Sequence, residues 1–138
     1  MKTDFQLIDQ ANGFPDLEQF RSEGSGAEVV FNGIVRSPNK GMDVLYLEFE
    51  AYEALFHNEM KRIAASLESQ FQINTVVLHH RIGRVLPGEL AVVAVVFSKH
   101  RKDAFDACAA LMNELKATVP IWKKEFNSDG SFWVSQTP

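Results

Sequence analysis

The sequence has 138 residues, of which 46% are hydrophobic and 23% charged, a balance typical of a globular domain with a sizeable core and not of a disordered chain. The formal net charge of −4 excludes a surface that is basic all over, so we expect a local anion site and no nucleic acid partner. Residues 1–60 hold four basic and eleven acidic residues, whereas residues 61–138 hold ten and seven, which places the basic chemistry in the second half.

The first half of the chain is expected to be rich in strands. Residues 5–7 alternate as an edge strand would, and residues 15–20 begin with proline, as a short helix often does. Residues 26–36 form the next predicted strand, in which Gly33 is consistent with a bulge or a close approach of the backbone. A turn then leads to a strand over residues 44–50, so we expect these two strands to form a hairpin.

The second half alternates helices with strands. Residues 52–71 carry apolar side chains at spacings of three and four, the pattern of a long amphipathic helix. Two runs rich in β-branched residues, 73–82 and 90–97, predict strands. A second helix is predicted over residues 102–118, and Pro120 ends it.

The last predicted elements are a pair of strands. Residues 121–126 are expected to pair with residues 132–134 across a turn that contains Gly130. This order of elements predicts an α+β fold with a largely antiparallel sheet. We expect residues 1–138 to form a single domain, because no repeat and no linker is visible.

Cysteine usage and hydropathy narrow the class of protein further. Cys108 is the single cysteine, which excludes a disulfide framework and a thiolate zinc site and fits a reducing cytosol. The longest apolar run, residues 90–97, is far shorter than the roughly 20 residues that a spanning helix needs. No targeting segment is visible at the N-terminus. We therefore expect a cytoplasmic protein with no membrane partner.

Lys116 is the most informative single residue. At about 100° per residue, with Phe105 at zero, Lys116 falls near +20° and Met112 near −20°, so we expect Lys116 within the apolar stripe of the second helix. A lysine there has to snorkel, find a partner or remain partly desolvated, which would suit it to proton transfer. The alternative is a lysine that caps carbonyls at the end of the helix.

A cationic cluster lies where the second helix begins, in the segment Ser98-Lys99-His100-Arg101-Lys102. Free backbone N–H groups at a helix N-terminus attract anions, and His100 and Arg101 would add donors and charge. Cations at this end oppose the helix dipole, so helix stability does not explain them. The pattern favours a phosphate or carboxylate site.

Three further cations allow a functional or a structural interpretation. Strand alternation sends Lys123 and Lys124 to opposite faces, so only one of them can share a site with Lys116. Both could instead be solvated edge charges that discourage aggregation. Arg36, which ends a strand before a turn, is either an anion clamp or a surface arginine.

No metal or nucleotide cofactor is expected. His79 and His80 face opposite sides of a strand, and no third ligand follows at a fixed short spacing. Cys108 falls within the apolar helix stripe and is expected to be a small core residue, not a nucleophile. The glycines at 24 and 26 lack the third glycine and the preceding strand of a dinucleotide-binding motif.

A series of short motifs runs in order from about residue 26 to residue 134. They are VFNGIVR at 30–36 with Asn39 and Gly41, LEFEAY at 47–52, HRIG at 80–83, PGE at 87–89, SKHRKDAF at 98–105, and LKATVPIWKKE at 115–125 with Asp129-Gly130 and Trp133-Val134. Together these motifs resemble the large, catalytic subunit of molybdopterin synthase. The pairs His100-Arg101 and Ala104-Phe105 and the segment at 120–125 are the most specific.

The resemblance implies a hammerhead-like α+β fold and a central homodimer flanked by two copies of a small ubiquitin-like sulfur-carrier subunit, which makes a heterotetramer. The partner would insert its Gly-Gly C-terminal tail, as a thiocarboxylate, into the catalytic pocket. Two sulfurs would pass to cyclic pyranopterin monophosphate and form the dithiolene of molybdopterin. The implied enzyme is a sulfurtransferase of molybdenum cofactor biosynthesis.

The resemblance also assigns site residues. It makes Lys116 and Lys123 the catalytic lysines, with the substrate and the tail held by Phe31, Arg36, Met112, His100 and Arg101. A chain whose one cysteine is expected to be buried has no evident carrier for reactive sulfur, which agrees with delivery by a partner. The loss of water and the repeated proton transfers during sulfur addition suit a lysine as acid and base.

The end of the sequence departs from the family pattern. The family often has a basic residue beyond the Trp-Val pair that reaches the neighbouring subunit, whereas residues 135–138 here are Ser-Gln-Thr-Pro. We therefore expect no phosphate contact across the dimer from these residues.

Two other functions remain open from the residues alone. A non-catalytic module could bind a phosphorylated small ligand through residues 98–102, and it would tolerate Lys116→Ala. Alternatively, Lys116 could form a Schiff base with a carbonyl substrate, which borohydride would trap. Nucleic acid binding is disfavoured, because the aromatic residues are not interleaved with a basic stripe.

Overall fold

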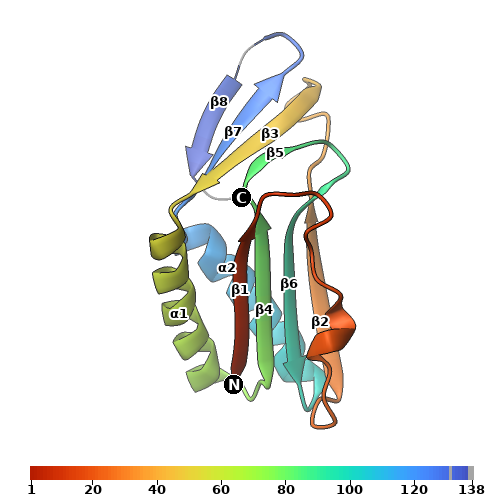
Figure 1. Ribbon diagram of the computed structural model, residues 1–138, viewed down its shortest axis with the longest axis vertical. Helices are drawn as coiled ribbons and strands as arrows, with labels where there is room; N and C mark the ends of the chain where they lie inside the picture. Colours follow the sequence, from red (N-terminus) through yellow and green to blue (C-terminus); the bar gives the residue numbers. More distant parts are fainter. Residues whose placement is uncertain (131, 137–138) are drawn as a thin grey trace.

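The computed structural model describes residues 1–130 and the backbone of residues 132–136. Two four-stranded sheets and two long helices make up the described chain (Figure 1). In chain order the elements are β1 (Lys2–Ile8), the 3-10 helix η1 (Leu17–Phe20), β2 (Ala27–Ile34), β3 (Val44–Ala51), α1 (Glu53–Gln70), β4 (Thr75–Arg81), β5 (Gly83–Val85), β6 (Leu90–Ser98), α2 (Arg101–Thr118), β7 (Ile121–Asn127) and β8 (Phe132–Gln136).

The first sheet has the strand order β1-β4-β6-β2. β6 runs antiparallel to both β4 and β2, whereas β1 runs parallel to β4. The two helices pack against one face of this sheet, and residues in and just before η1 pack against the other (Figure 1). Every residue of β4 is buried because both faces of the sheet are covered, and this includes the polar residues Thr75, His79, His80 and Arg81.

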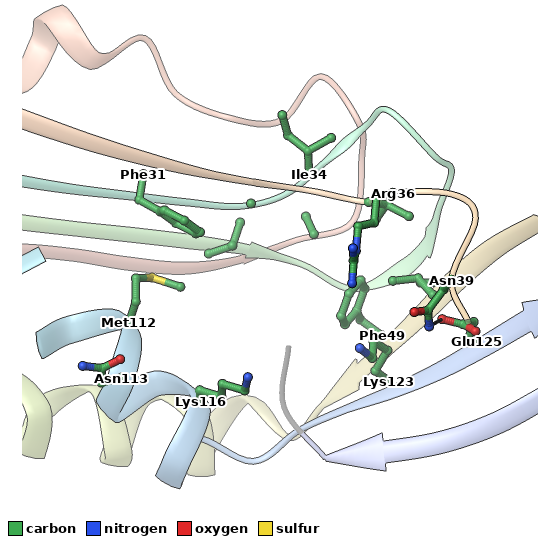
Figure 2. Close-up of a pocket in the computed structure, with 15 residues that line it drawn as sticks. Phe31, Ile34, Arg36, Asn39, Phe49, Met112, Asn113, Lys116, Lys123 and Glu125 are labelled. Carbon is green, nitrogen blue, oxygen red and sulfur yellow. Dashed lines mark hydrogen bonds between the residues drawn. The ribbon is translucent and has the colours of Figure 1, made fainter. Parts of the chain in front are cut away.

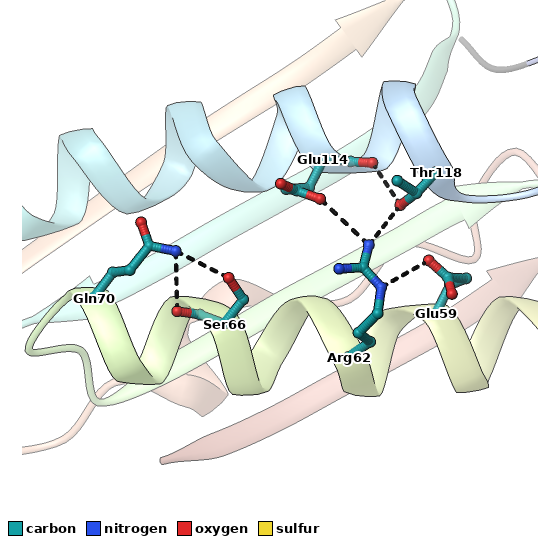
Figure 3. Close-up of polar contacts among 6 residues, drawn as sticks. All are labelled: Glu59, Arg62, Ser66, Gln70, Glu114 and Thr118. Atoms are coloured by element: carbon teal, nitrogen blue, oxygen red, sulfur yellow. Dashed lines mark hydrogen bonds and ion pairs between the residues drawn. The ribbon is translucent and has the colours of Figure 1, made fainter.

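The helices follow from their apolar spacing. α1 buries Phe56, Met60, Ile63 and Leu67, which lie three or four residues apart and therefore on one face. The exposed edge of the helix pair carries a polar contact, in which Arg62 of α1 donates hydrogen bonds to side chains near the end of α2 (Figure 3). The helix layer is therefore joined both through its core and along its solvent-facing edge.

The second sheet has the strand order β5-β3-β7-β8 and is antiparallel throughout. It lies beyond one end of the first sheet, on the side where α1 begins and α2 ends (Figure 1). Leu47 and Phe49 of β3 and Ile121 of β7 are buried in the same hydrophobic cluster as the helices and β4. One continuous core therefore connects the two sheets.

The structure confirms the α+β fold and its mostly antiparallel sheets. Both long helices and the pairing of β7 with β8 also agree with the sequence predictions. Gly33 lies at a register shift in β2, and a Cβ on it would lie 2.5 Å from Cγ1 of Val92, so the predicted bulge and close approach are both present.

The predicted hairpin between β2 and β3 is wrong. β2 pairs with β6 in the first sheet, and β3 pairs with β5 and β7 in the second. The loop at 35–43 crosses from one sheet to the other and does not turn back on its own strand. The parallel pairing of β1 with β4 and the three-residue strand β5 were not predicted, because neither has a local signal.

Within the described part of the chain, each helix is too short or too polar to cross a lipid bilayer. The expectation that residues 135–138 make no phosphate contact concerns side chains that lie outside the described residues.

Candidate functional site

A pocket of about 480 Å³ opens where the two sheets meet the C-terminal half of α2 (Figure 2). Its volume lies in the range that is usual for sites that bind small molecules. The described residues that line it are Phe31, Gly33, Ile34, Val35, Arg36, Asn39, Leu47, Phe49, Ala91, Val92, Met112, Asn113, Lys116, Lys123 and Glu125.

Local geometry explains why side chains distant in sequence meet here. Met112 and Lys116 lie one turn apart on α2, so both point from one side of that helix. Lys123 and Glu125 are two residues apart on β7 and therefore share a face of the second sheet. Arg36 enters from the loop that connects the sheets.

The pocket has an apolar end and a cationic end. Figure 2 shows the ring of Phe31 on β2 facing the side chain of Met112 on α2. At the other end, Arg36, Lys116 and Lys123 point into the same space from three different segments. A ligand with a flat apolar body and an anionic group would find both kinds of contact.

Lys116 does not lie in the buried stripe of α2, contrary to the sequence prediction. The buried side chains of α2 are Ala104, Ala107, Cys108, Leu111 and Leu115. Phe105, which set the predicted stripe, is 60% exposed, so the helix is rotated by about a quarter turn relative to the expectation. Lys116 lies at the border of the buried face, exposed in the single chain, with its amine in the pocket.

Strand alternation separates the two lysines of β7 as predicted. Lys123 lines the pocket and is half-buried. Lys124 points to the opposite face of the sheet, where its Nζ lies 5.8 Å from the centroid of the Phe126 ring. Lys123 is therefore the lysine of this pair that shares a site with Lys116.

The structure does not bring His100 and Arg101 to this pocket within one chain. Both are exposed at the N-terminus of α2, where His100 is the N-cap residue. Sixteen residues separate His100 from Lys116, which corresponds to about 24 Å along a helix that rises about 1.5 Å per residue. Five of the seven predicted site residues therefore line the pocket, and these two lie at the far end of the helix.

Comparison with known proteins identifies the family. The model of the family described as MoaE protein matches residues 8–118. The chain belongs to the MoaE protein family. Relatives in this family are named as molybdopterin synthase catalytic subunits, which gives the chain a catalytic role in molybdenum cofactor biosynthesis.

Three individual matches agree with membership of the MoaE family. The molybdopterin synthase catalytic subunit of Pyrococcus abyssi is 41% identical over 113 residues, which cover 82% of this chain and 76% of that protein. The crystal structure of molybdopterin synthase from Staphylococcus aureus matches with a TM-score of 0.84 at 34% identity, covering 95% and 96% of the two chains. A complex of subunits 1 and 2 of molybdopterin-converting factor from Helicobacter pylori matches with a TM-score of 0.69 at 25% identity, covering 93% and 85%.

Sequence reasoning missed three polar residues in the pocket of this MoaE family member, namely Asn39, Asn113 and Glu125. Nδ2 of Asn39 donates a hydrogen bond to Oε1 of Glu125 over 2.9 Å, and both residues line the pocket. Glu125 could have been found from its spacing, because it follows Lys123 by two residues on the same strand. Asn39 carried no such signal, since its place depends on a loop that crosses between the sheets.

The buried histidines lie outside the pocket. Nε2 of His79 lies 3.3 Å from Oδ2 of Asp4, on the opposite face of β4 from His80. His80 packs edge-on against Phe49, with the ring centroids 5.0 Å apart, and burial lowers its pKa to about 4. No group of three or more His, Cys, Asp or Glu side chains that could hold a metal ion occurs in the described part of the chain.

The cysteine is a core residue in the structure, as the sequence predicted. Cys108 is buried between the helix and the sheet, and burial raises the pKa of its thiol. A raised pKa keeps the thiol protonated and unreactive near neutral pH. The chain therefore offers no activated sulfur of its own among the described residues.

Proposed function

We propose that this chain transfers sulfur from the thiocarboxylated C-terminus of a small ubiquitin-like subunit to cyclic pyranopterin monophosphate and so forms the dithiolene of molybdopterin. The observation that carries this proposal is the pocket in which Arg36, Lys116 and Lys123 converge opposite Phe31 and Met112. Both ends of the pocket match parts of that substrate.

The two ends have separate binding roles. Phe31 and Met112 offer a polarizable apolar contact for the flat pterin ring. Arg36 supplies a planar guanidinium that suits a phosphate or a carboxyl group of the tail, and the two lysines add charge beside it. The substrate is thereby oriented with its reacting carbons near the amines.

Lys116 and Lys123 are the proposed acids and bases of the reaction. Each sulfur transfer forms a carbon–sulfur bond on the substrate as an oxygen leaves that carbon as water, and a second water molecule then cleaves the acyl–sulfur bond and releases the carrier as a carboxylate. The leaving oxygen has to gain a proton and the attacking water has to lose one. A pair of amines on opposite walls can exchange protons with both groups. Because Lys116 is exposed in the single chain, we assign the exclusion of water to the tail of the carrier once it fills the pocket.

The carrier subunit ends in Gly-Gly, and its narrow tail suits a pocket of this size. Support for such a partner comes from the Helicobacter pylori match, which is a complex of two subunits of the converting factor. The buried, protonated state of Cys108 also requires that sulfur come from outside the chain.

A homodimer completes the site in this proposal. Phe31 is 42% exposed on the edge strand β2, and Phe105 is 60% exposed on α2, so both of these elements present an aromatic side chain to solvent. A two-fold axis across these elements would run the α2 helices of two copies in opposite directions. His100 and Arg101 of one copy would then approach Lys116 of the other and add donors for the phosphate and the tail.

Organisation and location complete the proposal. The continuous core between the two sheets supports a single catalytic domain over residues 1–138, which would form the centre of a heterotetramer with two carrier subunits. The single cysteine supports a cytoplasmic location, because a reducing compartment does not select for disulfides.

Reconstitution tests this function directly. Purified chain, thiocarboxylated carrier and cyclic pyranopterin monophosphate are expected to yield molybdopterin, measured as its fluorescent oxidation product. Lys116→Ala is expected to lower the rate by about 10²- to 10⁴-fold, the range for loss of a general acid or base.

Lys124→Ala provides the matched control, since that lysine lies on the opposite face of β7. It is expected to retain the activity of the wild-type chain. Wild-type turnover by a folded Lys116→Ala variant would contradict the proposed mechanism. If no protein forms product, the wild-type chain included, the proposed function is wrong.

A further inference from the structure

We propose that Asn39 is a positioning residue that acts through Glu125, so that their hydrogen bond fixes the spacing between Arg36 and Lys123 across the pocket. The inference rests on the proposed function, because it concerns the same site. The proposed reaction does not itself require the side chain of Asn39.

The hydrogen bond joins two walls that belong to different sheets. Asn39 follows Arg36 by three residues in the loop that leaves β2, and Glu125 follows Lys123 by two residues on β7. Nδ2 of Asn39 and Oε1 of Glu125 are 2.9 Å apart across 86 positions of sequence. In Figure 2 the pair lies beside Phe49 at the cationic end of the pocket.

The loop that carries Asn39 is a compact unit. Asn39 and Met42 exchange two backbone hydrogen bonds of 2.9 and 3.0 Å, and Ser37 accepts a hydrogen bond from the backbone of Val44 at the end of the loop. Gly41 has a φ of 78°, which a glycine adopts without strain and which closes the turn. A displacement of Asn39 would therefore move the whole loop, together with Arg36.

The start of the loop is anchored to the first sheet. The backbone N–H of Val35 donates to the carbonyl of Glu89, and the N–H of Gly88 donates to the carbonyl of Val35. Arg36 thus begins from a fixed point on the first sheet, whereas Lys123 belongs to the second. The hydrogen bond between Asn39 and Glu125 ties the loop to β7, the strand that carries Lys123.

Burial of Glu125 strengthens its hydrogen bond with Asn39. Glu125 is 6% exposed, and it is the only carboxylate among the described residues that line the pocket. A buried carboxylate holds its hydrogen-bond donors strongly, because few water molecules can replace them. The carboxylate lines the same pocket as Arg36, Lys116 and Lys123, so its position affects the field that an anionic substrate meets.

Spacing matters because the substrate must touch both walls. When Arg36 holds the phosphate or carboxyl group, the reacting carbons come within reach of Lys123 only if the two walls of the pocket are the right distance apart. Misplacement of reacting groups by about 1 Å can lower a rate by about 10²-fold. Loss of the tie is therefore expected to affect both substrate binding and turnover.

An exchange of donor and acceptor tests the proposal. Asn39→Asp places two carboxylates together and is expected to lower kcat/KM by about 100-fold, with increases in KM for the pyranopterin as well as a lower kcat. The double variant Asn39→Asp with Glu125→Gln restores one donor and one acceptor and keeps the net charge of the pair. It is expected to recover kcat/KM to within about 5-fold of the wild-type value.

Asn39→Ala covers the case in which Asn39→Asp does not fold, and it is expected to raise KM about 10-fold. Asn58→Asp, which makes the same charge change on the exposed face of α1, is the control and is expected to be neutral. Circular dichroism and Tm are measured for every variant.

The outcomes separate this inference from the proposed function. If the wild-type chain forms no molybdopterin, the proposed function is wrong. If the wild-type chain is active and folded Asn39 variants have its kinetic constants, or if the double variant is no better than Asn39→Asp, the positioning role is overturned. A loss of Tm that the double variant restores without any recovery of kcat/KM would assign the pair to stability alone.

Discussion

The two ends of α2 differ in every respect that matters for the site. The C-terminal end places Met112 and Lys116 in the pocket and is tied to α1 through Arg62. The N-terminal end exposes His100 and Arg101 about 24 Å away, outside the pocket that Lys116 lines. In the proposed function, one rigid helix carries two sets of site residues that a single chain does not bring together, and a second copy would combine them.

Subunit complementation tests whether opposite ends of α2 from two copies serve one site. Lys116→Ala and Arg101→Ala are each expected to reduce activity as homodimers, the first by at least 10²-fold and the second by about 10- to 100-fold. Mixed after unfolding and refolding together, the two variants form a mixed dimer in which one site has both wild-type residues. Because half of the dimers are mixed and each has one intact site, about a quarter of wild-type activity is expected, measured as molybdopterin formed.

A site whose residues all come from one chain would give a different outcome. If Lys116 and Arg101 of the same chain served one site, every site in the mixture would lack one residue, and no activity would return. Lys102→Ala is the control for the N-terminal end, because its amine already pairs with Asp106 at 2.6 Å.

Acid stability sets the pH range in which variants at the two ends of α2 can be assayed. Burial holds the pKa of His80 at about 4 in the folded chain, against about 6.5 when unfolded. The unfolded chain therefore binds more protons between these values, and the free energy of unfolding falls as pH falls. Between pH 7 and pH 5 the loss is about 2 kcal/mol, and it levels off below pH 4.

Urea denaturation at pH 7 and pH 5 measures this loss. His80→Gln removes the titrating group and is expected to flatten the pH dependence by that amount. Equal pH dependence in the wild-type chain and His80→Gln would show that the buried imidazole is not responsible.

Loss of the contact between Arg62 and the C-terminal end of α2 is expected to change stability only slightly. Arg62 bonds Glu59, Glu114 and Thr118, but it is an exposed side chain (Figure 3). Arg62→Ala is expected to lower Tm by about 2 °C and to leave kcat/KM unchanged, because exposed ion pairs stabilise little. Calorimetry on Arg62→Ala and on Lys61→Ala, its exposed neighbour, checks this. A large fall in activity would show that this edge positions Lys116.

Local patterns predicted the helices well, and they failed where distant segments pair. The apolar spacing of three and four set the limits of α1, and Pro120 set the end of α2, because both signals act within a turn. The partner of β2 could not be predicted, since alternation states which face is buried but not which strand lies beside it. The loop at 35–43 therefore looked like a hairpin turn.

The site residues show the same contrast between local patterns, which were predicted, and contacts between distant segments, which were not. The separation of Lys123 from Lys124 follows from the two-residue period of a strand and was predicted correctly. The rotation of α2 was misjudged because Phe105 was taken as buried, although it is exposed. Asn39 was not identified as a site residue, because its contact with Glu125 depends on the crossing between the sheets.

Strands of the two sheets alternate along the chain, so strands that are made early pair with strands that are made late. β1 has to wait for β4, and β3, made before α1, has to wait for β7 near the end of synthesis. Such late pairing makes folding slow and leaves strand edges open for longer on the ribosome. Arg36 and Lys123 meet only when the last of these strands docks, so an incomplete chain holds no pocket that could trap substrate prematurely.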